Sequence, residues 1–164
     1  MAIKIGDKLP AGTLAEMTNN GPQNLSVEEL TKNKRVVIFG LPGAFTPTCS
    51  AKHVPGYVSL ADTLKASKID EIICVSVNDA YVMGAWAKDQ NAAGKVRMLA
   101  DGSAAFTKAL GLETDLTARG MGVRSQRYSM LVDNGVVTAL NVEAPGKFEV
   151  SNAETLLQQL QKLK

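Results

Sequence analysis

Short apolar runs rich in β-branched residues alternate along the chain with segments in which apolar residues recur at helical spacing. The strand-like runs occupy residues 35–40, 71–77 and 95–101. Helical periodicity covers residues 47–65, 80–90, 103–110 and 153–163. In the last of these, Leu156, Leu157, Leu160 and Leu163 share one helical face. This alternation of strands and helices predicts an α/β fold.

Two further apolar runs, RYSMLVD and VVTALNV, flank the dipeptide Asn134-Gly135. Both residues of the dipeptide readily adopt positive φ, so it favours a type I′ turn and predicts a β-hairpin. Between residues 111 and 126 the chain is polar and glycine-rich, which predicts a long loop. Pro55 lies inside the first predicted helix and removes a helix hydrogen bond, so we expect a kink there.

No internal repeat, low-complexity tract or flexible linker divides the chain, and we interpret residues 1–164 as a single domain. Strand–helix alternation followed by a hairpin and a last helix indicates an α/β sandwich with a mixed central sheet flanked by helices. The order of the strands in that sheet does not follow from the pattern alone.

The composition is that of an ordinary globular protein, with 45% hydrophobic and 21% charged residues. The formal net charge is only +2 and there is no long basic run, which argues against nucleic acid as a partner. No segment resembles a signal peptide or a membrane span, so we expect a cytoplasmic protein without a membrane partner. One histidine and two separated cysteines do not make a zinc site, and we expect neither a metal nor a cofactor.

Of the two cysteines, Cys49 has the sequence context of a reactive thiol. Thr46 suits the N-cap position and Pro47 the first helical position, which places Cys49 third in the helix. Unpaired backbone N–H groups and the helix dipole favour a thiolate there, just beyond the end of a predicted strand. Free cysteines are also often inert core residues, so position alone leaves both interpretations open.

The residue three positions before Cys49 argues against one class of thiol enzyme, the dithiol reductases. A dithiol reductase needs a second cysteine there to resolve its mixed disulfide, whereas this chain has Thr46. A hydroxyl can form a hydrogen bond but not a disulfide. The site therefore suits one nucleophile that attacks a small polar substrate.

The segment LPGAFTPTCSAKHVPG resembles the active-site segment of the peroxiredoxins, whose pattern is Pro-x-x-x-Thr-x-x-Cys. Pro42, Thr46 and Cys49 match this pattern, and the surrounding residues are similar to the type II, or peroxiredoxin-5-like, branch. The resemblance continues through SVNDAYVMGAWAK, LADGSAAFTKALGLE and RYSMLVDNGVVTALNVE, and so covers nearly the whole chain. It implies a thioredoxin-like fold, in agreement with the α/β pattern.

The resemblance also implies a thiol-dependent peroxidase that reduces hydrogen peroxide and organic hydroperoxides. The Cys49 thiolate would attack the peroxide and become a sulfenic acid, with Thr46 supplying a hydroxyl contact and Pro42 shielding the sulfur. A fixed cation is needed as well, and spacing does not choose among Arg119, Arg124 and Arg127. The resemblance selects Arg127, and it further implies a homodimer.

The sulfenic acid must be reduced by a second thiol. Cys74 is the internal candidate, but it lies in the middle of a predicted buried strand. The stretch after Asn141 contains no cysteine, unlike some peroxiredoxin-5-like proteins. We therefore expect an external thiol as reductant, either glutathione with glutaredoxin or thioredoxin.

Two alternatives from other functional classes remain open at this point. His53, four residues after Cys49, could serve as the base of a Cys-His hydrolase or acyl transferase. The chain could also be a non-catalytic thioredoxin-fold binding module that uses the loop of Arg119, Gly120, Gly122 and Arg124 to hold an anion.

Overall fold

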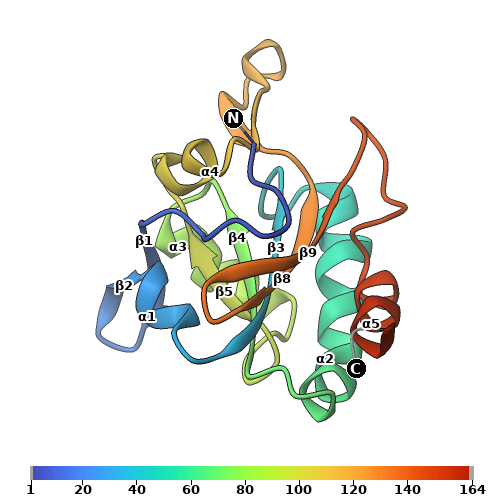
Figure 1. Ribbon diagram of the computed structural model, residues 1–164. Coiled ribbons are helices and arrows are strands. Elements are labelled where there is room, and N and C mark those ends of the chain that lie inside the picture. Colours follow the sequence, from blue (N-terminus) through green and yellow to red (C-terminus); the bar gives the residue numbers. More distant parts are fainter. Residues whose placement is uncertain (1, 163–164) are drawn as a thin grey trace.

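The computed structural model describes residues 2–162, which surround a central seven-stranded sheet (Figure 1). The strands follow the order β2-β1-β5-β4-β3-β8-β9. Their bounds are Thr13–Thr18 (β1), Gly21–Ser26 (β2), Arg35–Leu41 (β3), Glu71–Ser76 (β4), Arg97–Ala100 (β5), Tyr128–Asp133 (β8) and Val136–Val142 (β9). Strands β3, β4 and β5 run parallel, whereas β1, β2, β8 and β9 pair antiparallel with their neighbours. The prediction of an α/β fold with a mixed sheet is confirmed.

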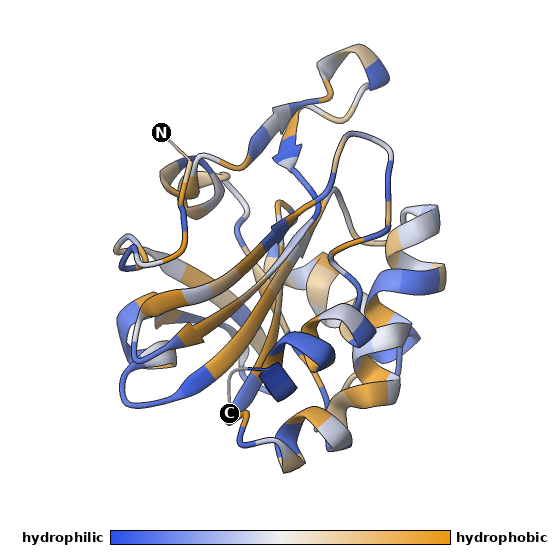
Figure 2. Cartoon of the chain, turned by 45° about the vertical axis from the view of Figure 1, so that its right-hand side comes forward, coloured by the Kyte–Doolittle hydropathy of each residue, from blue (hydrophilic) through white to orange (hydrophobic). Residues whose placement is uncertain are grey.

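Helices cover both faces of the sheet. On one face lie α2 (Val54–Ala66), α3 (Ala80–Asp89) and α5 (Ala153–Lys162), and on the other lie α1 (Val27–Thr31) and α4 (Ala105–Leu110). Alternation along β3 supplies both cores, because Val37 and Phe39 face the first layer while Val36 and Ile38 face the second. Figure 2 shows the apolar strands enclosed between helices whose outer surfaces are polar. Cys49 lies in the first of these cores.

The hairpin between β8 and β9 turns at Asn134 and Gly135, as predicted. Both residues have positive φ, 48° and 81°, which is the type I′ geometry. A bulge near Leu131 and Val132 then shifts the register, so that Tyr128 lies opposite Val142. Glu143, the next residue, donates its backbone N–H to the Arg127 carbonyl at 2.9 Å. The hairpin thus brings Arg127 and Glu143 together at the end of the sheet.

The predicted elements in the middle and at the end of the chain are present, with shifts of one to three residues at their ends. The predicted loop over 111–126 is wrong in part, because it contains the small hairpin of β6 (Glu113–Asp115) and β7 (Val123–Ser125) around a 3₁₀ turn, Thr117–Arg119. This hairpin projects from the body of the protein at the top of Figure 1. The last predicted helix is confirmed as far as Lys162, and Leu163 lies outside the described residues.

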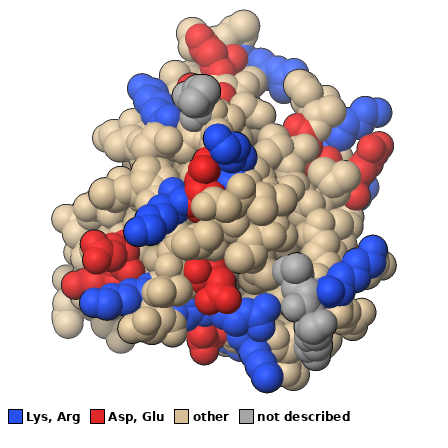
Figure 3. Space-filling model, in the orientation of Figure 1, with Lys and Arg blue, Asp and Glu red and all other residues tan. Residues whose placement is uncertain are grey.

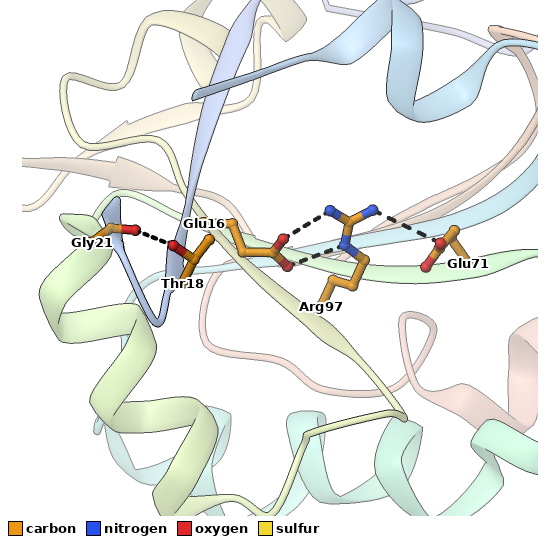
Figure 4. Close-up of polar contacts among 5 residues, drawn as sticks. All are labelled: Glu16, Thr18, Gly21, Glu71 and Arg97. Carbon is orange, nitrogen blue, oxygen red and sulfur yellow. Dashed lines mark hydrogen bonds and ion pairs between the residues drawn. The ribbon is translucent and has the colours of Figure 1, made fainter. Parts of the chain in front are cut away.

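The pattern of the sequence did not predict β1, β2 and α1. Strand β1 joins the rest of the sheet through a single residue pair, Ala15 with Ala100. Side chains strengthen this junction: Arg97 on β5 donates to the Glu16 carboxylate at 2.8 and 3.1 Å, and it lies 3.8 Å from Glu71 on β4 (Figure 4). The β1–β2 hairpin is therefore attached to the sheet by one ladder pair, by an ion pair and by the apolar side chains of β1 that pack into the two cores, all of them long-range contacts that local periodicity does not reveal.

The 18 basic and 16 acidic residues nearly balance along the chain. On the face shown in Figure 3, side chains of both signs are interspersed rather than gathered into one large patch of a single charge. Within residues 2–162, no helix is both long enough and apolar enough to cross a bilayer.

Candidate active site

Cys49 lies directly beyond the carboxyl end of β3. The strand ends at Leu41, a short loop follows, and helical structure begins at Pro47, so Cys49 is the third helical residue as predicted. Its side chain is buried. A π-helical turn, Cys49–His53, lies just before Pro55, where the sequence predicts a kink, and in this turn the Val54 N–H donates to the Cys49 carbonyl. This turn leaves Cys49 and His53 on the same side of the helix.

The loop between β3 and the helix is held in place by several hydrogen bonds. The Ala44 N–H donates to Asn78 Oδ1 at 2.9 Å, and this oxygen also accepts from the Ser76 hydroxyl. The Thr46 hydroxyl donates to the Gly43 carbonyl at 2.7 Å, rather than serving as the N-cap acceptor that the sequence suggested. Because its proton is committed in this way, Thr46 can offer only an acceptor oxygen to a bound substrate.

Arg127 is the cation that reaches the sulfur. Its Nη2 lies 3.3 Å from Cys49 Sγ and its Nη1 lies 3.0 Å from His53 Nδ1. The guanidinium also lies 5.8 Å from the centre of the Phe148 ring, within the range of a cation–π contact. Arg127 immediately precedes β8, so its backbone is fixed by the sheet. The fork of the guanidinium thus holds the thiol and the imidazole at the same time.

The other two candidate arginines have different places in the structure. Arg124 donates to the carbonyls of Pro42 and Met121 at 3.3 and 2.9 Å, and so ties the β6–β7 hairpin to the active-site loop. Arg119 is exposed on the 3₁₀ turn, at the wall of the cavity described below. Pro42, the remaining residue of the sequence pattern, is half-buried at the same cavity.

His53 is poorly suited to act as a base. Its Nε2 lies 3.1 Å from the Ser151 carbonyl, which can only accept, so Nε2 carries the proton and Nδ1 accepts from Arg127. Burial, together with the positive charge of Arg127, lowers the pKa of His53 to about 3. The imidazole therefore stays neutral and its lone pair is occupied by Arg127. The hydrolase alternative is not favoured by this arrangement.

Cys74 lies inside β4, opposite Phe39 of β3, and is fully buried in the same core as Cys49. Burial raises the pKa of the Cys74 thiol well above its usual value, and the neighbouring Cys49 raises it further. Both cysteines are free thiols. A buried, protonated thiol is a poor nucleophile, so Cys74 has the surroundings of a structural residue.

A cavity of about 610 Å³ opens next to the helix that carries Cys49. Thr46, Arg127 and Glu143 contribute polar groups to its wall, and the rest of the wall combines other polar and charged side chains with apolar ones. The apolar wall residues are Pro42, Pro47, Leu116, Met121, Ala144, Pro145 and Phe148. A site with a buried thiol, a fixed cation and an acceptor hydroxyl can bind a small oxidant that carries an O–H group. The cation can then polarise the bond that breaks when the second oxygen atom of this oxidant departs.

Sequence reasoning did not identify several residues that shape this site. Asn78 follows β4 at the same edge of the sheet as Cys49, and strand-end position was the signal that could have indicated it. The Trp86 Nε1 donates to the Ser50 hydroxyl at 3.0 Å and anchors the π-helical turn, a contact between distant segments that left no local signal. Glu143, Phe148 and Ser151 belong to the connection between β9 and α5, where no pattern pointed to the active site.

Comparison with known proteins supplies the context for this geometry. The Redoxin family model matches residues 4–157. Peroxiredoxin-2C of Arabidopsis thaliana is 49% identical over 159 residues, which cover 96% of this chain and 98% of the relative. The structure of reduced Prx3 in complex with H₂O₂ from Vibrio vulnificus is 59% identical with a TM-score of 0.93, over 96% of this chain and 99% of that one. A Burkholderia cenocepacia structure with the provisional description of a thioredoxin reductase is 62% identical with a TM-score of 0.95, over 96% and 98% of the two chains.

Proposed function

The chain belongs to the peroxiredoxins of the Redoxin family and is a thiol-dependent peroxidase with their thioredoxin-like fold, and from this premise we propose how its own residues carry out the reaction. Cys49 is the nucleophile, Arg127 its cationic partner and Thr46 the acceptor that orients the peroxide. The observation that carries this assignment is the 3.3 Å contact between Arg127 Nη2 and Cys49 Sγ. Pro42 shields the sulfur from the cavity side.

The chemical step transfers one oxygen atom to the sulfur. The Cys49 thiolate attacks the terminal oxygen of a hydroperoxide, a new S–O bond forms and the O–O bond breaks. The departing oxygen takes up one proton from water, which balances the proton that the Cys49 thiol released on ionisation, and it leaves as an alcohol, or as water from hydrogen peroxide. The O–O bond is the oxidant, and sulfur is oxidised to the sulfenic state. Arg127 remains charged throughout, so it can stabilise the negative charge as this moves from sulfur to the departing oxygen.

We propose that the enzyme accepts organic hydroperoxides as well as hydrogen peroxide. The cavity is much larger than hydrogen peroxide requires, and its wall includes the apolar side chains of Leu116, Met121 and Phe148. These side chains offer apolar surface to an alkyl substituent on the substrate, at about 25 cal/mol for each Å² removed from water. A comparison of kcat/KM for hydrogen peroxide and cumene hydroperoxide tests this proposal.

For the second half of the cycle we propose an external thiol, either glutathione with glutaredoxin or thioredoxin. The support is the position of Cys74, whose burial and raised pKa leave it protonated and enclosed in the core. Cys49 is also buried, but Pro47, Thr48 and its partner Arg127 line a cavity, and this cavity is the side from which we propose that a small thiol or a partner protein approaches. One external thiol attacks the Cys49 sulfur, forms a mixed disulfide and releases the sulfenic oxygen as water. A second external thiol then attacks the mixed disulfide, so that Cys49 returns to the thiol and the two external thiols, which supply the two electrons, leave as a disulfide.

The decisive experiment measures peroxide consumption by the wild type, Cys49→Ser and Cys74→Ser, each supplied separately with the glutathione–glutaredoxin and thioredoxin systems. We expect Cys49→Ser to be inactive and Cys74→Ser to turn over with at least one of the two. Activity that persists in Cys49→Ser would overturn the assignment of the nucleophile. Loss of turnover in a folded Cys74→Ser, with both reductants present, would instead show that Cys74 takes part in resolution.

Two further proposals concern the protein in the cell. We propose a cytoplasmic location, since two buried free cysteines suit a reducing compartment. We also propose a homodimer, supported by two exposed aromatic side chains, Phe45 at 53% and Tyr81 at 69% exposure. Light scattering on the purified protein tests the dimer, and cell fractionation tests the location.

A further inference from the structure

Residues 143–151, which make up nearly all of the connection between β9 and α5, form a strap beside the active-site end of the protein (Figure 1). From its contacts we infer that Glu143 is a positioning residue of the peroxidase site. Its carboxylate holds the far end of the strap so that the Ser151 carbonyl fixes the His53 imidazole, which in turn fixes Arg127 against Cys49. This inference rests on the roles proposed above for Cys49 and Arg127.

The first step is the set of hydrogen bonds between the Glu143 carboxylate and the strap. The backbone N–H groups of Glu149, Val150 and Ser151 donate to its oxygens at distances from 2.8 to 2.9 Å, and the Ser151 hydroxyl donates at 2.7 Å. The side chain is buried. Burial opposes ionisation, but the hydrogen bonds from Glu149, Ser151 and Val150 outweigh it and lower the pKa of Glu143 below its usual value. An ionised carboxylate thus organises three consecutive backbone amides.

The second step connects Glu143 to the backbone of Arg127, directly before β8. The backbone N–H of Glu143 donates to the Arg127 carbonyl at 2.9 Å. Glu143 therefore fixes the backbone of Arg127 from one side while its carboxylate fixes the strap that reaches the Arg127 side chain from the other. Glu143 thus supports Arg127 in two ways, through its own backbone N–H and through its carboxylate.

The third step runs from the strap to the sulfur. The Ser151 carbonyl accepts from His53 Nε2 at 3.1 Å and from the Tyr57 hydroxyl at 2.9 Å. This contact fixes the tautomer in which His53 Nδ1 is an acceptor, and Nδ1 receives Arg127 Nη1 at 3.0 Å. If the Ser151 carbonyl moves away, the imidazole can rotate or change tautomer, and Arg127 loses one of the two contacts that orient it.

Phe148 gives the strap a second contact with the same pair. Its ring centre lies 5.1 Å from that of His53 and 5.8 Å from the Arg127 guanidinium. Because Phe148 lies between Glu143 and Ser151 in the strap, the hydrogen bonds at Glu143 also hold this ring in place. The strap thus supports the imidazole and the guanidinium by a hydrogen bond and by aromatic packing together.

The test compares Glu143→Gln with Glu149→Gln. Glutamine has nearly the same shape, but its amide NH₂ cannot accept hydrogen bonds. Some of the hydrogen bonds that the Glu143 carboxylate accepts from the strap are therefore lost. Glu149→Gln removes one negative charge from the same strap at an exposed side chain and is the matched control. His53 is the single histidine of the chain, so the ¹⁵N NMR shifts of its ring give an unambiguous readout of tautomer and protonation.

For the wild type and Glu149→Gln we expect a neutral imidazole at pH 7 with the proton on Nε2. For Glu143→Gln we expect a mixture of tautomers or a protonated ring, together with a fall of about tenfold in the rate constant for peroxide reduction. Loss of stability alone would not alter the His53 signals of the folded molecules. Unchanged His53 shifts and an unchanged peroxide rate in a folded Glu143→Gln would overturn the inference.

One further measurement, made on the wild type, keeps the test decisive. A wild-type ring with its proton on Nδ1 would refute the network without any variant, even in a case where Glu143→Gln does not fold. Failure of the proposed function is distinguishable, because it would appear as peroxide consumption that does not depend on Cys49.

Discussion

Replacing Arg127 by lysine keeps the positive charge but removes the planar fork. In the structure the guanidinium donates to two acceptors, Cys49 Sγ at 3.3 Å and His53 Nδ1 at 3.0 Å, and it lies over the Phe148 ring. A single ammonium group cannot reproduce this arrangement. A hydrogen bond to a charged group contributes about 1.5–3 kcal/mol, so loss of one such bond to the transition state should slow peroxide reduction by roughly 10- to 100-fold.

Arg127→Gln removes the charge as well, and we expect a larger loss, on the order of 10²–10³. The measurement is stopped-flow fluorescence of Trp86 after mixing the reduced protein with peroxide. Trp86 is the single tryptophan, and its indole N–H donates to the hydroxyl of Ser50, the neighbour of Cys49. Its emission should therefore respond to the oxidation of the sulfur.

The control is Arg35→Lys, the same substitution at the opposite end of β3 from the site. We expect it to react with peroxide at the wild-type rate. If a folded Arg127→Lys also reacted at the wild-type rate, the geometry of the guanidinium would not matter. The reasoning from the two contacts would then be refuted, and charge alone would account for the role of Arg127.

Substitutions at three other positions test separate features. Thr46→Val, which lacks the acceptor oxygen, should lose about 10²-fold in peroxide rate, whereas Thr46→Ser should stay close to wild type; equal rates in stopped-flow would contradict the role of the hydroxyl. His53 has a pKa of about 3 in the folded state and about 6.5 in the unfolded state. Between these pH values the unfolded chain binds a proton on His53 that the folded protein does not bind. The free energy of unfolding is therefore highest above pH 6.5 and falls as the pH is lowered. Between pH 7 and 5 the free energy of urea unfolding should drop by about 2 kcal/mol, and the same drop in His53→Gln would refute this assignment. Glu16→Gln weakens the partly exposed pair with Arg97 and should lower the free energy of unfolding by about 0.5–1 kcal/mol, with no change in peroxide rate; a change in that rate would show coupling to the site.

The register of Cys49 illustrates what local sequence can establish. Thr46 and Pro47 mark a helix start, because a proline at the first helical position costs no backbone hydrogen bond. The structure begins the helix at Pro47 and places Cys49 third, as predicted. The Asn134-Gly135 turn was likewise predictable, since both of its residues tolerate positive φ. In each case the determining interactions lie within a few residues of one another.

The choice of the cation was not a local matter. Spacing left Arg119, Arg124 and Arg127 equivalent, and only family resemblance selected Arg127. In the structure the pairing of β8 with β3 brings Arg127 to the sulfur, while Arg124 is engaged with the Pro42 carbonyl. Which side chain meets Cys49 therefore depends on strand pairing across more than 75 residues of chain.

By itself, then, the sequence determined the α/β class, the buried strands, the helix start at Cys49 and the type I′ hairpin, because each depends on neighbouring residues. The tertiary structure alone decided the placement of the β1–β2 hairpin and the bulge that sets Glu143 beside Arg127. It also decided the strap that carries Ser151 to His53. These features arise from contacts between distant segments, whose free energy exists only once the segments have been brought together, so no local pattern encodes them.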